Sequence, residues 1–201
     1  MKRYGSLLYF CMFLLFSASC ERPNYENEIL KTYQEAERLS TSGTVIDGNM
    51  WSARSERWMT LKEADDYCYY LTELDHRDWR LPTINELRTL IKDCPKTKAG
   101  GSCGLTDECI TNEENSVYNC FEPQSCNCEQ RYYYQGDSSY SKLGDWEELW
   151  SSIQNDCRND EDAWYVDFSN GGIRQPTSSS NRACEHYTSP ANYVRCIRKN
   201  H

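Results

Sequence analysis

Twelve cysteines are the residues of this chain with the most definite chemistry. Cys20 follows two basic residues, an apolar run from Leu7 to Phe16 and three small residues at 17–19. This arrangement is typical of an exported precursor in which residues 1–19 form a signal peptide. A cysteine directly after it predicts lipid attachment to Cys20; cleavage that leaves Cys20 free or paired is the alternative. The apolar run is about half of the ~20 residues that span a bilayer, so a permanent transmembrane helix is not expected there.

Cleavage after residue 19 removes Cys11, and lipid attachment occupies Cys20, so ten cysteines remain for pairing. An even number in an exported protein is typical of a disulfide framework. A metal cluster is the rival interpretation, because Cys126 with Cys128 and Cys103 with Cys109 could supply thiolates. Zinc sites favour paired Cys-x2-4-Cys knuckles, which do not occur here, and an oxidising compartment disfavours free thiolates. We therefore expect disulfides and no metal at Cys68, Cys94, Cys103, Cys109, Cys120, Cys126, Cys128, Cys157, Cys184 and Cys196.

Catalytic chemistry has little support in the sequence. The histidines are His76, His186 and His201, and none lies in a motif with a recognisable catalytic role. No catalytic residue and no cofactor is therefore expected. Calcium is the one cation to consider, since four acidic residues between Asp156 and Asp162 offer enough oxygen ligands for it. A charge run is more often a solvated loop, so calcium binding there is kept as an alternative.

Tyrosines are the best candidates for ligand contact. Tyr132, Tyr133 and Tyr134 are consecutive, with Tyr140 and Trp146 nearby. Tyrosine gives rigid, amphipathic contact area at low entropic cost, a property that binding loops use. The alternative is that these rings fill the surrounding cysteine-rich segment, which has few aliphatic residues of its own.

Net charge and length restrict the partners. The chain of 201 residues has a formal net charge of −9, so it is a poor partner for DNA, RNA or other polyanions. The basic cluster Arg195, Arg198 and Lys199 is interpreted as a solvated strand end. The mature length suits one domain, residues 43–201, preceded by a tether of residues 20–42.

Local patterns predict an α+β domain. Thr60 with Glu63 and Thr83 with Glu86 are capping boxes, and each starts a run of apolar residues at helical spacing. An irregular, disulfide-rich excursion with little core of its own is predicted for residues 92–140. Strands are predicted at 44–51 as a hairpin turning at Asp47-Gly48, at 149–153, at 164–168 as a half-buried strand before a two-residue Asn170-Gly171 turn, and at 193–197.

A series of motifs spans about residues 43–199. It includes Met50-Trp51-Ser52, Tyr67-Cys68, Asp78-Trp79-Arg80-Leu81-Pro82-Thr83 with Glu86-Leu87, Leu149-Trp150-Ser151-Ser152, Ala163-Trp164-Tyr165-Val166-Asp167-Phe168 and Tyr193-Val194-Arg195-Cys196. In this order the motifs resemble those of the Lcl C-terminal domain family, which is similar to the C-type-lectin fold shared by formylglycine-generating enzymes. The resemblance implies two helices packed on one twisted antiparallel sheet, with the termini close together. It implies adhesion, or binding of a glycan or protein, more than catalysis.

The resemblance also implies partners for four of the cysteines. Cys68 lies on the apolar face of the first helix and Cys196 on the last strand, which a lectin-like fold brings together, so we expect a Cys68–Cys196 bridge. Cys157–Cys184 is the second expected pair. The other six cysteines are expected to pair among themselves, with fifteen connectivities open.

These interpretations favour a non-enzymatic binding module whose ligand is a glycan or a protein and which meets the membrane through its lipid alone. The expected location is a bacterial envelope, lipid-anchored at the outer membrane or cell surface, or otherwise periplasmic or secreted. An enzyme of the formylglycine-generating type, which needs reduced cysteine, and a purely structural envelope protein are the alternatives. Trp79, Arg80 and Leu81 are expected to hold the start of the second helix and not to bind a ligand.

Overall fold

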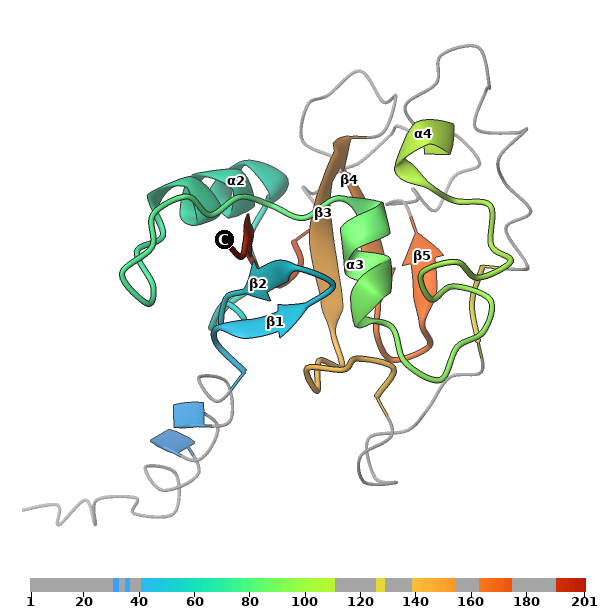
Figure 1. Cartoon of the computed structure of the whole chain (residues 1–201), viewed down its shortest axis with the longest axis horizontal. Helices are drawn as coiled ribbons and strands as arrows, with labels where there is room; N and C mark the ends of the chain where they lie inside the picture. Colours follow the sequence, from blue (N-terminus) through green and yellow to red (C-terminus); the bar gives the residue numbers. More distant parts are fainter. Residues whose placement is uncertain are drawn as a thin grey trace, which may run out of the picture. The chain divides into compact units, whose positions relative to one another are not determined.

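The computed structural model describes residues 31–32, 35–36, 41–110, 126–128, 139–154, 163–174 and 191–201. The chain divides into two compact units, Met1–Glu37 and Arg38–His201. In the first unit the described pairs 31–32 and 35–36 are helical. The second unit holds the strands and helices that are labelled in Figure 1.

The first and last of these strands share one antiparallel sheet, ordered β1-β2-β6. β1 (Thr44–Ile46) and β2 (Asn49–Trp51) form the predicted hairpin. Its two turn residues have positive φ, 50° at Asp47 and 76° at Gly48, the conformation that favours Asp-Gly in two-residue hairpin turns. β6 (Ile197–Lys199) pairs with the other edge of β2, so the end of the chain returns to the first hairpin.

The last strand begins at Ile197, and the prediction that it begins at Tyr193 is wrong. The segment before Ile197 changes partner along its length. Trp150 donates its amide to the Tyr193 carbonyl (3.1 Å), whereas Ser52 donates its amide to the Cys196 carbonyl (2.9 Å). The segment passes from the second sheet to the first. It therefore forms no continuous row of backbone hydrogen bonds with a strand of either sheet.

Both predicted helices are present, each with its capping box. α2 (Leu61–Tyr70) begins after Thr60, whose side chain accepts from the Glu63 amide (3.3 Å) while the Glu63 carboxylate accepts from the Thr60 amide (2.9 Å). α3 (Ile84–Leu90) has the same arrangement at its own start. These bonds satisfy amides that have no partner within the helix. Both residues of each capping box are close in sequence, so the sequence predicted where the helices begin. A short helix in the excursion, α4 (Asp107–Ile110), was not predicted.

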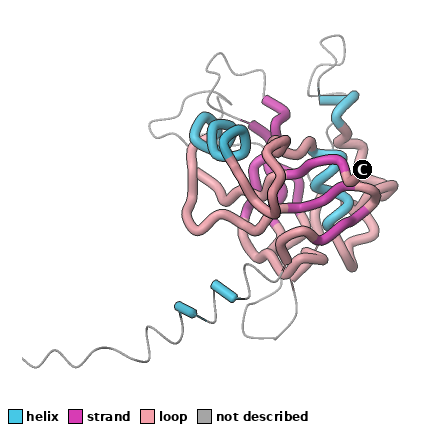
Figure 2. The backbone as a smooth tube through the Cα atoms, turned by 60° about the vertical axis from the view of Figure 1, so that its left-hand side comes forward, coloured by secondary structure: helices cyan, strands magenta, loops and turns pink. Residues whose placement is uncertain are grey.

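A second antiparallel sheet has β4 (Ala163–Asp167) at its centre, between β3 (Glu148–Gln154) and β5 (Gly172–Arg174). Trp164 and Val166 on one face of β4 pack in the core that α3 completes, and the opposite face packs on the apolar side of α2. Figures 1 and 2 show α2 and α3 on different sides of β3 and β4. β4 is therefore buried on both faces, and not half-buried as predicted.

The turn between β4 and β5 spans residues 168–171, so the predicted two-residue Asn170-Gly171 turn is wrong. Inside the turn, the Asp167 carboxylate accepts from the Ser169 amide (2.9 Å) and from its hydroxyl (2.6 Å). The side chain of Phe168 enters the core. These bonds also explain why Asp167 is buried although it lies on the more polar side of the strand.

The α+β class is confirmed, but the single sheet implied by the family resemblance is wrong, because the strands form two three-stranded sheets. The excursion also contributes more core than predicted. Cys94, Leu105 and Tyr140 are buried in the same apolar cluster as the residues of α3. Disulfide-bonded cysteines and an aromatic ring fill the space that aliphatic side chains usually fill.

The expected disulfide between Cys68 and Cys196 is present and joins α2 to the segment before β6. Both residues are fully buried, and their Cα atoms lie 5.5 Å apart, an ordinary distance for a disulfide. The two cysteines are separated by 128 residues. Closing so long a loop stabilises the fold by about 4–5 kcal/mol in the chain-entropy model.

Candidate binding surfaces

Two disulfides fix the base of the cysteine-rich excursion. Cys94 is bonded to Cys128, with Cα atoms 6.0 Å apart, and Cys103 is bonded to Cys126, with Cα atoms 5.1 Å apart. Cys109 is disulfide-bonded as well. The sequence left these pairings open, and both pairs lie within the six cysteines that were expected to pair among themselves. Covalent bonds therefore join the described stretches 94–110 and 126–128.

Arg88 is the polar centre of this base. It lies on α3, is 3% exposed, and donates from Nη1 to the Leu105 carbonyl (2.7 Å) and from Nε to the Thr97 carbonyl (2.9 Å). Burial lowers the pKa of Arg88, and the charge of Asp107 opposes that shift. One guanidinium thus satisfies carbonyls that an irregular segment would otherwise bury without partners. Its Nη2 also donates to the carbonyls of Lys98, Gly101 and Cys103.

The base is also fastened to the turn between β4 and β5. The Thr97 hydroxyl donates to the Gly171 carbonyl (2.6 Å), and the Cys128 amide donates to the Asn170 carbonyl (2.8 Å). Gly171 has a φ of +62°, and a Cβ there would lie 3.3 Å from the Cys94 sulfur, so both conformation and space favour glycine. Helix, turn and disulfides together position the ends of the excursion.

Most candidate site residues named from the sequence lie outside the described residues. They are Cys20, Tyr132, Tyr133, Tyr134, the Cys157 and Cys184 pair, the acidic run Asp156–Asp162 and His186. Within the described part of the chain, no group of three or more His, Cys, Asp or Glu side chains could hold a metal ion. The described residues that bear on binding are therefore the base of the excursion and the exposed surfaces of the domain.

Trp79, Arg80 and Leu81 lie where a structural role requires them. Trp79 and Leu81 are buried against α2, and Arg80 donates to the Glu86 carboxylate from two nitrogens, at 2.6 and 2.8 Å. Hydrogen bonding to Glu86 raises the pKa of Arg80. Burial alone would raise the pKa of Glu86, but the bonds from Arg80 and from the Thr83 amide lower it overall. The pair ties the approach to α3 to its capping box.

Two of the three C-terminal basic residues are buried, so the interpretation of this cluster as a solvated strand end is wrong. Arg195 is 2% exposed and donates to the Asp145 carboxylate at 2.8–3.0 Å and to the Ser52 carbonyl at 2.8 Å. Arg198 pairs with Asp78 at 2.7 Å. The two carboxylates lie 50 and 120 residues away in the sequence from their arginines, so a local sequence pattern could not reveal these pairs.

Trp58 is a large aromatic side chain that the domain leaves exposed. It is 64% exposed, and its ring meets Tyr193 edge to face with centroids 6.0 Å apart. The Arg54 guanidinium lies 4.6 Å from the centroid of the same Tyr193 ring and pairs with Glu147. Covering the exposed part of such a ring is worth about 2 kcal/mol. We call Trp58, Tyr193, Arg54 and Glu147 the Trp58 surface.

The loop that carries Trp58 is held on both sides by the C-terminal segment. The Ser55 amide donates to the Val194 carbonyl (2.8 Å), and the Val194 amide donates to the Ser55 hydroxyl (3.0 Å). Met59 and Asn192 exchange two backbone bonds of 2.9 and 3.1 Å. Because Ser55 and Val194 are 139 residues apart in the sequence, the sequence gives no signal that singles out Trp58.

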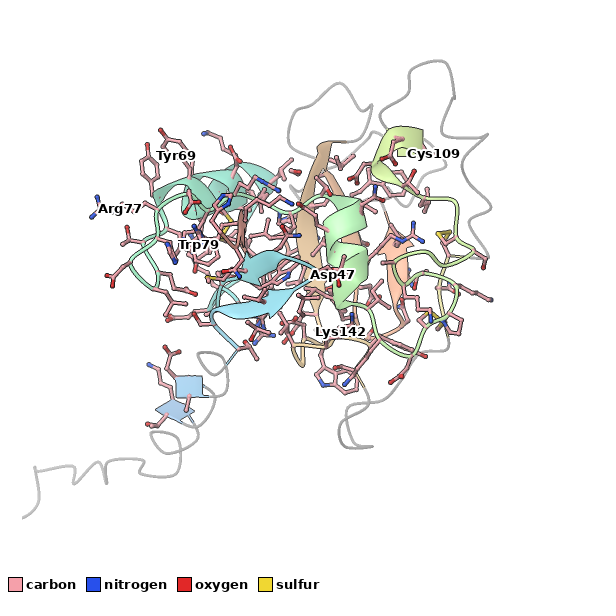
Figure 3. The ribbon with its side chains drawn as sticks, viewed as in Figure 1. Asp47, Tyr69, Arg77, Trp79, Cys109 and Lys142 are labelled. Atoms are coloured by element: carbon pink, nitrogen blue, oxygen red, sulfur yellow. A yellow bond between two sulfur atoms is a disulfide. The ribbon has the colours of Figure 1, made fainter. Side chains whose placement is uncertain are left out.

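Tyr69 and Tyr70 form a second exposed aromatic pair, at the end of α2. They are 71% and 76% exposed and meet edge to face with centroids 4.9 Å apart. Figure 3 shows Tyr69 pointing away from the domain, with Arg77 on the loop that follows the helix. This pair gives an aromatic surface of exposure similar to that of Trp58, on a different element.

One face of the second sheet gathers polar groups. The strand register places Glu148 opposite Asp167 and Tyr165 opposite Arg174, so the four lie on the same face. Although Glu148 as a residue is exposed, partial burial of its carboxyl, and then the charges of Asp167 and Glu147, raise its pKa. Burial raises the pKa of Tyr165. Two like charges therefore face each other across the strands, with Arg174 3.7 Å from Asp167 to offset them.

The sequence was compared with models of known protein families, with curated proteins and with solved structures. The family model of the Lcl C-terminal domain matches residues 43–198. The chain belongs to the Lcl C-terminal domain family. The match confirms the resemblance that the motifs indicated. The matched residues include strands β1 to β5 and helices α2 to α4. No curated protein and no solved structure matches the chain.

Membership in the Lcl C-terminal domain family suggests a bacterial surface-associated protein. The disulfides are compatible with an extracytoplasmic location, since such bonds persist in oxidising compartments. Among the residues that the structure describes, no helix has the length and apolar character needed to cross a membrane.

Proposed function

We propose that this Lcl C-terminal domain is a non-enzymatic binding module of the bacterial envelope, with a glycan or a protein as its ligand. The observation that supports this most directly is the base of the excursion, where Arg88 and the bridges Cys94–Cys128 and Cys103–Cys126 fix the described stretches around residues 94–105 and 126–128. Long loops on a rigid framework commonly carry recognition. Such pre-organisation also lowers the entropic cost of binding.

The tyrosines at 132–134 are the proposed ligand contacts. They lie between Cys128, which is bonded to Cys94, and Tyr140, whose amide donates to the Phe168 carbonyl at 3.0 Å, so both ends of the stretch that carries them are held. Tyrosine rings can stack on sugars or cover apolar patches of a protein. The acidic balance of the chain favours neutral or cationic partners over sulfated polysaccharides.

A C-type-lectin-like fold is proposed for the domain. Support comes from the α+β composition, from α2 and α3 on different sides of the second sheet, and from the pairing of β1 and β6 with β2. An experimental structure superposed on lectin-like domains tests the proposal. A strand order that cannot be superposed would contradict it without affecting the family assignment.

Anchoring through a lipid on Cys20 is the proposed link to the membrane, with residues 20–42 as the tether. The leader and the position of Cys20 support it. Metabolic labelling with a fatty-acid analogue should mark the wild-type chain and leave Cys20→Ala unlabelled. Equal labelling of both would refute the anchor.

An array of glycans and matrix proteins, probed with the oxidised mature chain, tests the binding function. We expect saturable binding to at least one ligand, which a purely structural envelope protein would lack. Repeating the array with a chelator tests calcium at Asp156–Asp162.

The formylglycine-generating alternative needs a reduced cysteine pair, whereas the seven cysteines of the described residues are all disulfide-bonded. Thiol titration of the native chain distinguishes the binding module from the enzyme: reactive thiols at Cys120, Cys157 or Cys184 would favour the enzyme.

A further inference from the structure

We propose that the Trp58 surface is a second binding site, separate from the tyrosines of the excursion, and that it takes a neutral saccharide. The proposal shares one premise with the proposed function, that the domain binds an external ligand. It places the contact on the loop between β2 and α2 and on the C-terminal segment, where the sequence motifs predicted no site.

The first support is that Trp58 is exposed and yet held. The bonds of Ser55 with Val194 and of Met59 with Asn192 fix the backbone on either side of it. Arg57 donates to the Trp58 carbonyl at 3.2 Å. A 64% exposed indole on so constrained a loop offers a flat apolar area without the entropic cost of ordering it.

The second support is the chemistry around the ring. Arg54 pairs with Glu147, Arg57 pairs with Glu63 at 3.2 Å, and Glu56 is exposed on the same loop, so both donors and acceptors are present and the balance is slightly acidic. A sugar hydroxyl both donates and accepts, which suits such a border. The C–H groups of a pyranose ring can meanwhile lie against the electron-rich face of the indole.

The same border argues against other occupants. Trp, Tyr and Arg are enriched at the cores of protein–protein interfaces, but Glu, Asp and Lys are depleted there, whereas here Glu147 and Glu63 pair with the arginines beside the aromatic group. A sulfated polysaccharide would meet these carboxylates and a chain of net charge −9. A small, uncharged polyol is therefore the ligand that the surface favours.

The test is a titration of the oxidised mature chain with a panel of neutral oligosaccharides built from glucose, galactose, mannose and N-acetylglucosamine. The readout is the indole N–H signal of Trp58 in a proton–nitrogen correlation spectrum, assigned by its loss in Trp58→Ala. We expect at least one member to shift that signal in a saturable way, and Trp58→Ala to weaken its binding tenfold or more. Tyr70→Ala, which removes a ring that is 76% exposed on another element, should bind as the wild type does.

Each outcome decides the proposal. Trp58→Ala should melt as the wild type does, because the ring is mostly exposed, so a loss of binding is not a loss of fold. No saturable shift from any neutral saccharide, or unchanged affinity in Trp58→Ala, would overturn it. A shift caused only by dextran sulfate or by a protein from the array would also overturn it, while leaving the proposed binding function standing. Absence of every ligand, in both the panel and the array, would remove the two together.

Discussion

At the residue scale, buried arginines connect segments that have few regular hydrogen bonds of their own. Arg88 serves the excursion and Arg195 serves the C-terminal segment, each with several oxygen acceptors. Guanidinium suits this because its five donors lie in a fixed planar fork. Neither role was predictable from the sequence. An arginine on an amphipathic helix normally faces solvent, and only the folded excursion shows what Arg88 contacts.

Arg88→Lys is expected to loosen the base of the excursion. A lysine offers three donors from one point and cannot reach carbonyls spread from Thr97 to Leu105, so some become buried without partners. Each such group costs about 1–3 kcal/mol. The melting temperature should fall, and limited proteolysis should cut between residues 95 and 105. Unchanged stability with full protease resistance would show that Arg88 is not needed there.

Glu148→Gln is expected to stabilise the domain at neutral pH. Burial of its carboxyl and the charge of Asp167 raise the folded-state pKa of Glu148. The folded protein therefore holds this proton more tightly than the unfolded chain, and stability falls as pH rises through the folded pKa. Removing the charge should raise the free energy of unfolding by about 0.5 kcal/mol at pH 7 and by nearly nothing at pH 3.

Urea unfolding of Glu148→Gln at the two pH values measures this difference. Glu147→Gln is the matched control, because it removes the neighbouring carboxylate that pairs with Arg54 and should destabilise slightly. A Glu148→Gln variant that is less stable than the wild type at pH 7 would show that the carboxylate makes a favourable contact instead.

At the element scale, the helix starts and the first hairpin turn were predictable from local sequence, whereas the pairing of strands into sheets was not. The capping boxes at Thr60 and Thr83 lie within four residues of sequence, so both helix starts were found. The Asp47-Gly48 hairpin was found for the same reason. The length of the β4–β5 turn was missed because it depends on the side chain of Asp167 and on the burial of Phe168. The distribution of strands over two sheets depends on contacts between distant segments.

The Arg80–Glu86 pair gives a prediction about α3. Arg80→Ala removes two hydrogen bonds to the carboxylate that also caps the helix. Because the Arg80 side chain is half exposed, the loss should be about 1 kcal/mol, seen as a lower melting temperature. Ligand affinity measured on the folded fraction should not change. A large loss of affinity at an unchanged melting temperature would show that Arg80 belongs to a binding site.

At the scale of the whole molecule, the Cys68–Cys196 disulfide ties α2 to the segment that precedes β6. Cys68 and Cys196 could be paired from the family resemblance, because a lectin-like fold brings the first helix to the last strand. The pairs within the excursion could not, since six cysteines in an irregular segment allow fifteen connectivities. Cys94–Cys128 and Cys103–Cys126 are determined by how the segment folds against Arg88 and Gly171.

Replacing Cys68 and Cys196 together by alanine is expected to cost about 4–5 kcal/mol of unfolding free energy. The control is the double replacement of Cys103 and Cys126, whose bond spans 23 residues and should cost about 3 kcal/mol in the same model. Non-reducing urea titrations measure both. Peptide mapping that joins Cys68 to any cysteine of the 94–128 cluster would contradict the assignment.

The claim most exposed to test is that the braced excursion carries ligand recognition through its tyrosines. The measurement is the affinity of the best array ligand for the wild type and for a variant with Tyr132→Ser, Tyr133→Ser and Tyr134→Ser, with the disulfides verified by mapping. We predict that the triple replacement weakens binding tenfold or more, a loss of about 1.4 kcal/mol, with the melting temperature retained. Unchanged affinity in the folded, fully bridged variant would contradict the account and move the site away from the excursion.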